Sequence, residues 1–184
     1  MKSRELSDAS RYGVLVTAAE PRRARTTTWL TEEEQEAWRA VAMIFMQLPG
    51  PLDGQLQRDS GITLFEYMVL SYLSMAPRHT LRMSELAEFA NGSLSRLSNV
   101  AKRLEQRGWL TREPDPADGR YTVASLTDEG WQLVRDAAPG HVNAVRQLVI
   151  EPLTAAQLRT LSVIGRRLRA GLDQGGTTQR PAQT

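Results

Sequence analysis

Hydrophobic residues recur every three or four positions along most of this chain, which is the period of an α-helix. The pattern predicts six helices, at residues 31–48, 63–75, 84–90, 93–107, 127–150 and 154–172. Three of them begin at a threonine that is followed three residues later by Glu or Gln, namely Thr31, Thr63 and Thr154. This spacing is a capping box, in which the two side chains accept hydrogen bonds from free N–H groups at the helix start.

Two other boundaries and one interruption follow from single residues. Ser84 and Ser93 are candidate N-caps of the third and fourth helices, because a serine hydroxyl accepts a hydrogen bond from the first turn. The dipeptide Pro139-Gly140 lies inside the fifth predicted helix. Proline lacks the backbone donor that the helix needs, so we expect a kink or a break there.

Only one part of the chain has the two-residue period of a β-strand. Segments 109–112 and 121–125 are rich in β-branched and aromatic residues, and they flank a turn that contains Pro, Asp and Gly. This arrangement predicts a β-hairpin. The expected fold class is therefore mainly α with a small β-hairpin, an α+β fold without internal repeats.

The composition narrows the chemistry. The chain has 184 residues, of which 41% are hydrophobic, and a formal net charge of +2, so a folded core is expected. It contains no cysteine and two histidines, which excludes disulfides, thiolate metal sites and a histidine-rich metal cluster. We expect no cofactor and no metal. No apolar run reaches the roughly 18–20 residues of a membrane span, and no secretory signal is recognisable, so we expect a cytoplasmic protein.

The predicted helix at 93–107 has two distinct faces. Its apolar residues share one stripe, and they are Leu94, Leu97, Ala101 and Leu104. Between residues 93 and 112 there are five Lys or Arg and a single acid, Glu105, in a chain that is otherwise nearly neutral. Arginine and asparagine can each form two parallel hydrogen bonds with a base edge in the major groove. A solvated helix surface is the plain alternative, but this composition favours contact with nucleic acid.

The hairpin adds a second basic element. The predicted helices at 84–90 and 93–107 form a helix–turn–helix. A helix–turn–helix followed by a two-stranded hairpin is the layout of a winged helix, in which Arg120 lies at the base of the wing tip. Narrow minor grooves concentrate negative potential and attract a guanidinium. Asp118 either holds Arg120 extended or only shapes the turn, and an ordinary exposed arginine is the alternative for Arg120. The residues that we assign to the DNA interface are Ser93, Ser95, Arg96, Ser98, Asn99, Lys102 and Arg103 on the helix, and Asp118, Gly119 and Arg120 on the wing.

Four short motifs in this region resemble the winged-helix core of the MarR family of transcriptional regulators. They are Ser-Glu-Leu-Ala at 84–87, Arg-Leu-Glu-x-x-Gly at 103–108, Asp-x-Arg at 118–120 and Leu-Thr-x-x-Gly at 126–130. Each motif alone is weak, but their order and spacing fit the family without a gap. In one respect the chain departs from it, because Gly119 stands where the family often carries a second arginine.

The resemblance implies a homodimer whose first and last helices interlock and whose two winged helices bind a palindromic operator in double-stranded DNA. It implies a sequence-specific transcriptional regulator, usually a repressor, with the recognition helix in the major groove and the wing arginine in the minor groove. The expected organisation is a disordered basic tail at 1–28, dimerisation helices at 29–50 and 127–172, a DNA-binding winged helix at 62–126, and a disordered tail at 173–184.

Many members of this family also bind a small aromatic effector between the dimer helices and the winged helix. Residues here that could line such a cleft are Trp38, Tyr67, Met68 and His141. Aromatic residues and methionines at helical spacing more often belong to a hydrophobic core, so this cleft is a secondary hypothesis.

Two other classes of function were weighed. A winged helix can serve as a protein–protein interaction module, in which case the polar face at 93–107 would not read bases. An enzyme is not expected, because the sequence has no catalytic triad arrangement, no glycine-rich phosphate loop and no paired carboxylates placed in a defined cleft.

Overall fold

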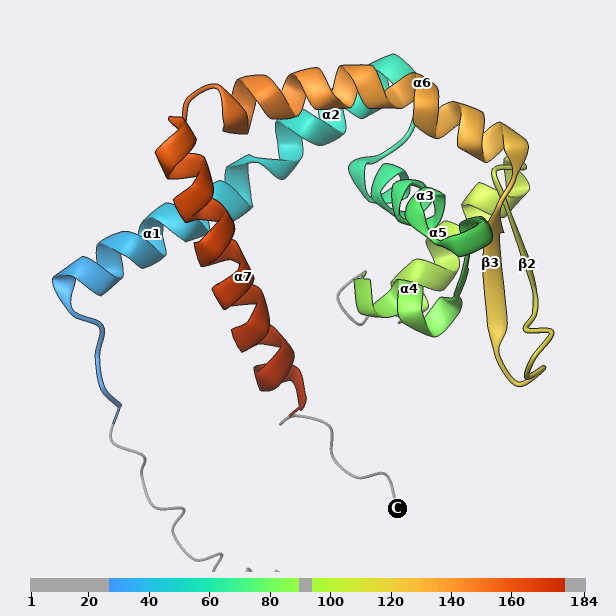
Figure 1. Ribbon diagram of the computed structural model, residues 1–184, viewed down its shortest axis with the longest axis horizontal. Coiled ribbons are helices and arrows are strands. Elements are labelled where there is room, and N and C mark those ends of the chain that lie inside the picture. Colours follow the sequence, from blue (N-terminus) through green and yellow to red (C-terminus); the bar gives the residue numbers. More distant parts are fainter. Residues whose placement is uncertain (1–26, 90–93, 178–184) are drawn as a thin grey trace, which may run out of the picture. The chain divides into compact units, whose positions relative to one another are not determined.

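The computed structural model describes residues 27–89 and 94–177 (Figure 1). The chain divides into two units, residues 1–39 and 40–184. The elements are α1 (Glu32–Gln47), α2 (Pro49–Ser60), α3 (Leu64–Met75), a 3-10 turn (Pro77–His79), β1 (Thr80–Arg82), α4 (Met83–Phe89), α5 (Leu94–Gln106), β2 (Leu110–Pro114), β3 (Thr122–Leu126), α6 (Asp128–Val145), a π-helical turn (Arg146–Ile150) and α7 (Ala155–Thr177).

The three predicted capping boxes are confirmed, and each starts its helix where the sequence indicates. In the box before α3, the backbone N–H of Glu66 donates to Thr63 Oγ1 at 3.2 Å, and the N–H of Thr63 donates to the Glu66 carboxylate at 2.9 Å. The Thr31 and Thr154 boxes show the same reciprocal pairs. Local hydrogen bonding therefore sets these boundaries.

Ser84 is not an N-cap, which corrects one expectation. Helix α4 begins at Met83, and the capping position belongs to Arg82, whose N–H donates to the Glu85 carboxylate at 2.9 Å. The acid three residues after Arg82 satisfies the donor without a hydroxyl. The other simple candidate, Ser93, lies outside the described residues, as do tail residues 1–26 and 178–184.

Helix α2 was not expected from the sequence, because Pro49-Gly50-Pro51 is typical of a loop. The structure places Pro49 in the first turn, where the missing N–H costs nothing, and Gly61 ends the helix in the left-handed conformation with φ of 66°. Leu52 and Leu56 are buried. Burial of this face therefore stabilises a helix that propensity alone disfavours.

The expected kink at Pro139-Gly140 stays a prediction, but the expected break is wrong, since α6 is helical through both residues. Packing of α6 along α2 explains this (Figure 1). A Cβ at Gly140 would meet Gln55 Nε2 at 2.8 Å, so the glycine lets the two helices approach closely. The α-helical hydrogen-bond pattern changes only after α6, in the π-helical turn at Arg146–Ile150. At its far end the chain also departs from expectation, because α7 continues to Thr177 rather than ending at 172.

The hairpin is confirmed and belongs to a three-stranded antiparallel sheet in the order β1-β3-β2. The short strand β1, which the sequence pattern did not reveal, pairs Thr80 with Ser125, and β2 pairs Leu110 with Leu126. The main core joins this sheet to α3, α4 and α5. Its fully buried side chains include Leu70, Leu73, Leu86, Leu97, Leu104 and Leu110. The fold is thus mainly helical with a wing sheet, as the sequence predicted.

None of the helices that the structure describes combines the length and the apolar character needed to cross a bilayer.

Gly130 in the first turn of α6 offers a test of packing at the base of the wing. A Cβ there would lie 2.0 Å from the Trp109 carbonyl oxygen and 2.9 Å from Leu126 Cδ1. We expect Gly130→Ala to lower the free energy of unfolding by about 3 kcal/mol, because backbone must move to relieve the overlap. Chemical denaturation measures the loss.

The matched control is Gly54→Ala in α2, where the new Cβ would meet only the end of the Arg58 side chain at 3.2 Å. Its unfolding free energy should stay within about 1 kcal/mol of the wild type. Equal stability of both variants and the wild type would contradict the assigned packing.

Candidate nucleic-acid interface

Helix α5 buries one face completely and exposes the other. Leu97, Ala101 and Leu104 are each 0% exposed, which confirms these three members of the predicted apolar stripe, whereas the side chain of the fourth, Leu94, lies outside the described residues. The candidate DNA-contacting residues of the other face are exposed, and within the described range they are Ser95, Arg96, Ser98, Asn99, Lys102 and Arg103. Because the buried stripe packs against α3, α4 and the sheet, the exposed face has a fixed direction.

Arg96 is oriented by an aromatic neighbour on another helix. Its guanidinium lies over the Phe65 ring of α3 at 4.4 Å from the centroid. A cation in this position is attracted by the ring's negative face. Phe65, Ser95, Arg96 and Asn99 line a surface hollow of about 490 Å³, so these polar groups converge on one place.

Arg103 has a structural contact that the sequence pattern did not indicate. Its Nε donates to Glu66 Oε1 at 3.2 Å, which joins α5 to the capping box of α3. Burial raises the pKa of the Glu66 carboxyl, but the hydrogen bonds from Thr63 and the Arg103 guanidinium outweigh it. The pKa of Glu66 therefore lies below its ordinary value, and the carboxylate stays charged.

Glu105, the single acid of this basic segment, also has a structural partner. The Arg112 guanidinium in β2 donates to Glu105 Oε2 at 2.6 Å, and the backbone N–H of Arg112 donates to Oε1 at 3.2 Å. Arg112 accordingly lowers the pKa of Glu105. Arg107 lies over the Trp109 ring and donates to the Gly61 carbonyl. Much of the positive charge near α5 thus holds the winged helix together.

The wing carries Arg120 on an exposed tip. The side chain of Arg120 is 84% exposed, and it forms a two-pronged pair with Asp118, with Nη2–Oδ2 at 2.6 Å and Nε–Oδ1 at 2.9 Å. This arginine lowers the pKa of Asp118. Between the two, Gly119 has open space around the position of a Cβ. The structure therefore leaves room for the second arginine that the family often carries there.

Of the four residues proposed for an effector cleft, Tyr67 and His141 lie together. Tyr67 is buried and its ring lies 4.6 Å from that of His141, tilted by 51°. Burial raises the pKa of Tyr67 and lowers that of His141. Met68 instead lines a hollow of about 470 Å³ with Pro49, Phe65 and Arg96 among others. Trp38 belongs to the N-terminal unit and is 61% exposed.

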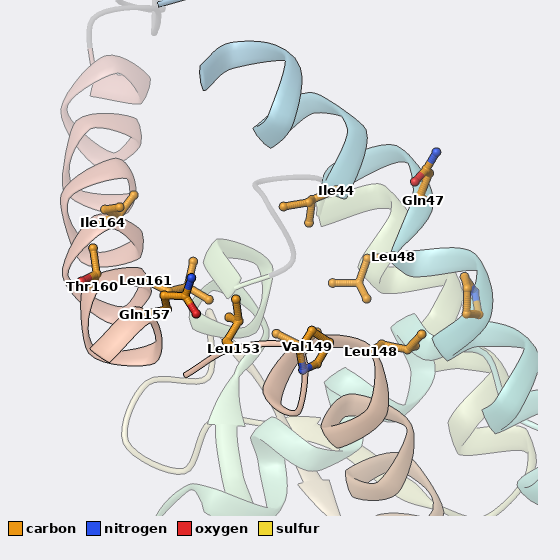
Figure 2. Close-up of a pocket in the computed structure, with 12 residues that line it drawn as sticks. Ile44, Gln47, Leu48, Leu148, Val149, Leu153, Gln157, Thr160, Leu161 and Ile164 are labelled. Atoms are coloured by element: carbon orange, nitrogen blue, oxygen red, sulfur yellow. The ribbon is translucent and has the colours of Figure 1, made fainter. Parts of the chain in front are cut away.

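A third hollow, far more apolar, lies at the ends of the long helices within the unit at 40–184. It has a volume of about 820 Å³, and its lining includes Ile44, Leu48, Leu148, Val149, Leu153, Leu161 and Ile164. Figure 2 shows the side chains of the π-helical turn and of α7 beside those of α1. Ile44, Leu161 and Ile164 are 44–58% exposed, so this surface is open to solvent in a single chain.

Comparison with known proteins identifies the family. A model described as "MarR family" matches residues 60–120. The transcriptional repressor MprA of Escherichia coli is 29% identical over 120 residues, covering 65% of this chain and 68% of that protein. The transcriptional repressor Rv2887 of Mycobacterium tuberculosis is 34% identical over 99 residues, covering 54% of this chain and 69% of that protein.

Solved structures agree with the sequence matches. Sco3205 of Streptomyces coelicolor, a MarR family transcriptional regulator solved in complex with DNA, is 46% identical with a TM-score of 0.76, covering 80% of this chain and 92% of that one. AbsC of the same organism, another MarR family regulator, is 34% identical with a TM-score of 0.75, covering 80% and 99%.

This chain belongs to the MarR family of transcriptional regulators, which are winged-helix proteins and not enzymes. The resemblance noted in the four sequence motifs is thereby confirmed. Neither the role of Arg82 nor the partner of Glu105 was predicted from the sequence. Arg82 lies 33 residues from its partner Asp115, and no local spacing signals such a pair.

Substituting the buried acid of α3 tests the link between α3 and α5. We expect Glu66→Gln to lower the free energy of unfolding at pH 7 by about 1–3 kcal/mol, because a charge-assisted hydrogen-bond network is lost. A carboxylate whose folded pKa is lowered stabilises the fold above its unfolded pKa and loses that effect as the pH falls through the folded pKa. The difference between wild type and variant should therefore shrink below about pH 4.

Denaturant titrations at several pH values measure this, with Glu88→Gln on the exposed side of α4 as the matched control. A gap between wild type and Glu66→Gln that is the same at pH 3 and pH 7 would show that the carboxylate charge is not involved.

Proposed function

We propose that this protein is a sequence-specific repressor that binds a palindromic operator as a homodimer. The observation that carries the proposal is the exposed face of α5. It presents Ser95, Arg96 and Asn99 to solvent, while the opposite face of the helix is fully buried. Side chains of these types can read base edges in the major groove. Further support comes from Sco3205, the 46% identical protein that was solved in complex with DNA.

In this proposal α5 is the recognition helix, and Arg120 enters the adjacent minor groove. The high exposure of Arg120 suits a side chain that must project from the protein surface into a minor groove. Ser98 and Lys102 supply further polar and positive contacts, and Ser93, Asp118 and Gly119 complete the predicted set. The contact with Glu66 makes Arg103 a residue with a structural role as well. The proposed DNA-binding segment is 62–126.

The homodimer is proposed from the apolar surface of the long helices. Leu161, Ile164 and Leu168 share one face of α7 and are 44–50% exposed, and Phe45 near the end of α1 is 70% exposed. Exposed apolar side chains of this kind, beside the apolar hollow that Leu161 and Ile164 line with Ile44, are typical of a protein interface. Helices at 29–50 and 127–172 would form it, and a twofold axis then places two recognition helices on two half-sites of a palindrome.

A small aromatic effector is not part of the proposal. Tyr67 and His141 pack on each other, and Met68 lines a hollow with Pro49, Phe65 and Arg96, so the effector cleft stays a prediction from the sequence.

DNA selection from a random pool tests base reading. We expect the wild type to recover a palindrome and to bind it at least about 10³-fold more tightly than random duplex, with affinity falling as salt rises. Asn99→Ala should relax the preference at one position of each half-site by about 1–3 kcal/mol, because asparagine reads one base edge.

The control for Asn99→Ala is Gln132→Ala, which removes an exposed amide on α6, outside the proposed DNA-binding segment. Equal affinity of the wild type for every duplex would overturn the proposal and favour the alternative, a winged helix used only for protein contacts.

Substituting α7 tests the dimer. Leu168→Glu should weaken self-association by at least about tenfold, because it places a charge in an apolar interface. Operator affinity should fall with it, since two linked half-site contacts become one. Light scattering should give the wild type a mass near twice 20.6 kDa.

Arg166→Glu, on the opposite side of α7, carries a larger change of charge and serves as the control. A wild-type mass of a single chain would overturn the dimer.

A further inference from the structure

Arg82, at the end of β1, has contacts with the wing and with the helix–turn–helix. Its Nε donates to Asp115 Oδ2 at 2.6 Å, and its guanidinium lies over the Tyr121 ring at 4.6 Å from the centroid. Its backbone N–H donates to the Glu85 carboxylate and so caps α4. One residue therefore joins the wing tip to the first helix of the helix–turn–helix.

The side chain reaches across the sheet to make these contacts. Strand β3 lies between β1 and β2, and Arg82 pairs with Val123 of that central strand. Asp115 follows the last residue of β2, on the far side of β3. The ion pair thus links the two outer strands at the point where their regular pairing ends, with Pro114 opposite Thr122 as the last pair.

Asp115 is the residue that organises the wing tip. It is 8% exposed, its N–H donates to the Tyr121 carbonyl at 2.8 Å, and its Oδ1 accepts from the Ala117 N–H at 2.8 Å. The hydrogen bond from Ala117 and the charge of Arg82 lower the pKa of Asp115. A carboxylate that is buried and charged needs such partners. Holding Asp115 and Tyr121 therefore holds both ends of the loop that carries Arg120.

From these contacts we infer that Arg82 is a positioning residue for DNA binding, which fixes the wing tip, and with it Arg120, relative to the recognition helix. The inference rests on the proposed function. Its physical basis is preorganisation, because a loop that is already ordered before binding loses less conformational entropy on binding. Beyond the last strand pair, Gly119 adds conformational freedom to the backbone of the wing tip. The contacts of Arg82 with Asp115 and Tyr121 limit that freedom.

A cycle of substitutions separates positioning from simple charge. The variants are Arg82→Ala, Asp115→Asn and Arg120→Ala, alone and as Arg82→Ala/Arg120→Ala and Asp115→Asn/Arg120→Ala. The probe is the duplex that the wild type selects from a random pool, at fixed salt. Exposed Arg135 on α6 provides the control Arg135→Ala, which removes one positive charge outside the proposed DNA-binding segment 62–126. Thermal unfolding of each variant confirms that the fold is intact at the temperature of the binding assay.

Positioning predicts that Arg82→Ala and Asp115→Asn each weaken operator binding by about tenfold. It also predicts that each has less than about a twofold effect when Arg120 is already alanine, because the group they position is gone. Asp115→Asn is the sharper variant, since it makes the protein more positive and simple attraction to phosphate would tighten binding. If it does not fold, Arg82→Ala gives the same test, because that side chain is 38% exposed and its loss leaves the core in place.

Additive losses in Arg82→Ala/Arg120→Ala would show that Arg82 contacts DNA itself and would overturn the inference. Tighter binding by Asp115→Asn would do so as well. Both results leave wild-type operator preference intact, so they are distinguishable from failure of the proposed function, in which the wild type would have no preference and the inference would fall with it.

Discussion

The complete burial of one face of α5 is the constraint on which the rest of the candidate site depends. Leu97, Ala101 and Leu104 have no exposed surface, and the core that surrounds them draws on α3, α4 and all three strands. A helix held in this way cannot rotate about its axis without exposing apolar area, at about 25 cal/mol for each Å². The polar edge is therefore presented in one direction, which is what selective contact with a base edge requires.

Charge in this winged helix serves two purposes. A basic stretch of sequence is easily interpreted as a phosphate-binding patch, yet Arg103 and Arg112 pair with Glu66 and Glu105 inside the domain, and Arg107 packs on Trp109. Partly buried ion pairs of this kind fix the relative positions of elements, because an arginine fork bonds only in a narrow range of geometries. The exposed basic residues of the candidate interface include Arg96, which lies over the Phe65 ring, Lys102, and Arg120, which pairs with Asp118.

The features that could be predicted from the sequence depend on residues that are close together in the chain. The capping boxes at Thr31, Thr63 and Thr154 determine helix starts within four residues of chain, and the polar face of α5 follows from helical periodicity alone. Non-local packing decided the rest. Helix α2 exists because Leu52 and Leu56 are buried, and α6 packs closely along it because Gly140 leaves room for Gln55. For the same reason, the partners of Arg82 and Glu105 became visible only in the structure.

The pair between Asp118 and Arg120 connects these themes. An exposed ion pair contributes little to stability, so its presence at the wing tip is better explained by the orientation that it imposes on Arg120. The carboxylate also opposes the approach of phosphates, which confines favourable contact to a guanidinium that projects beyond it into a groove. Without support from the base of the loop, that orientation would be lost in the motion of the whole tip. In the proposed function, an arginine that enters the minor groove therefore needs two levels of order, namely its local pair with Asp118 and the contacts of Arg82 with Asp115 and Tyr121.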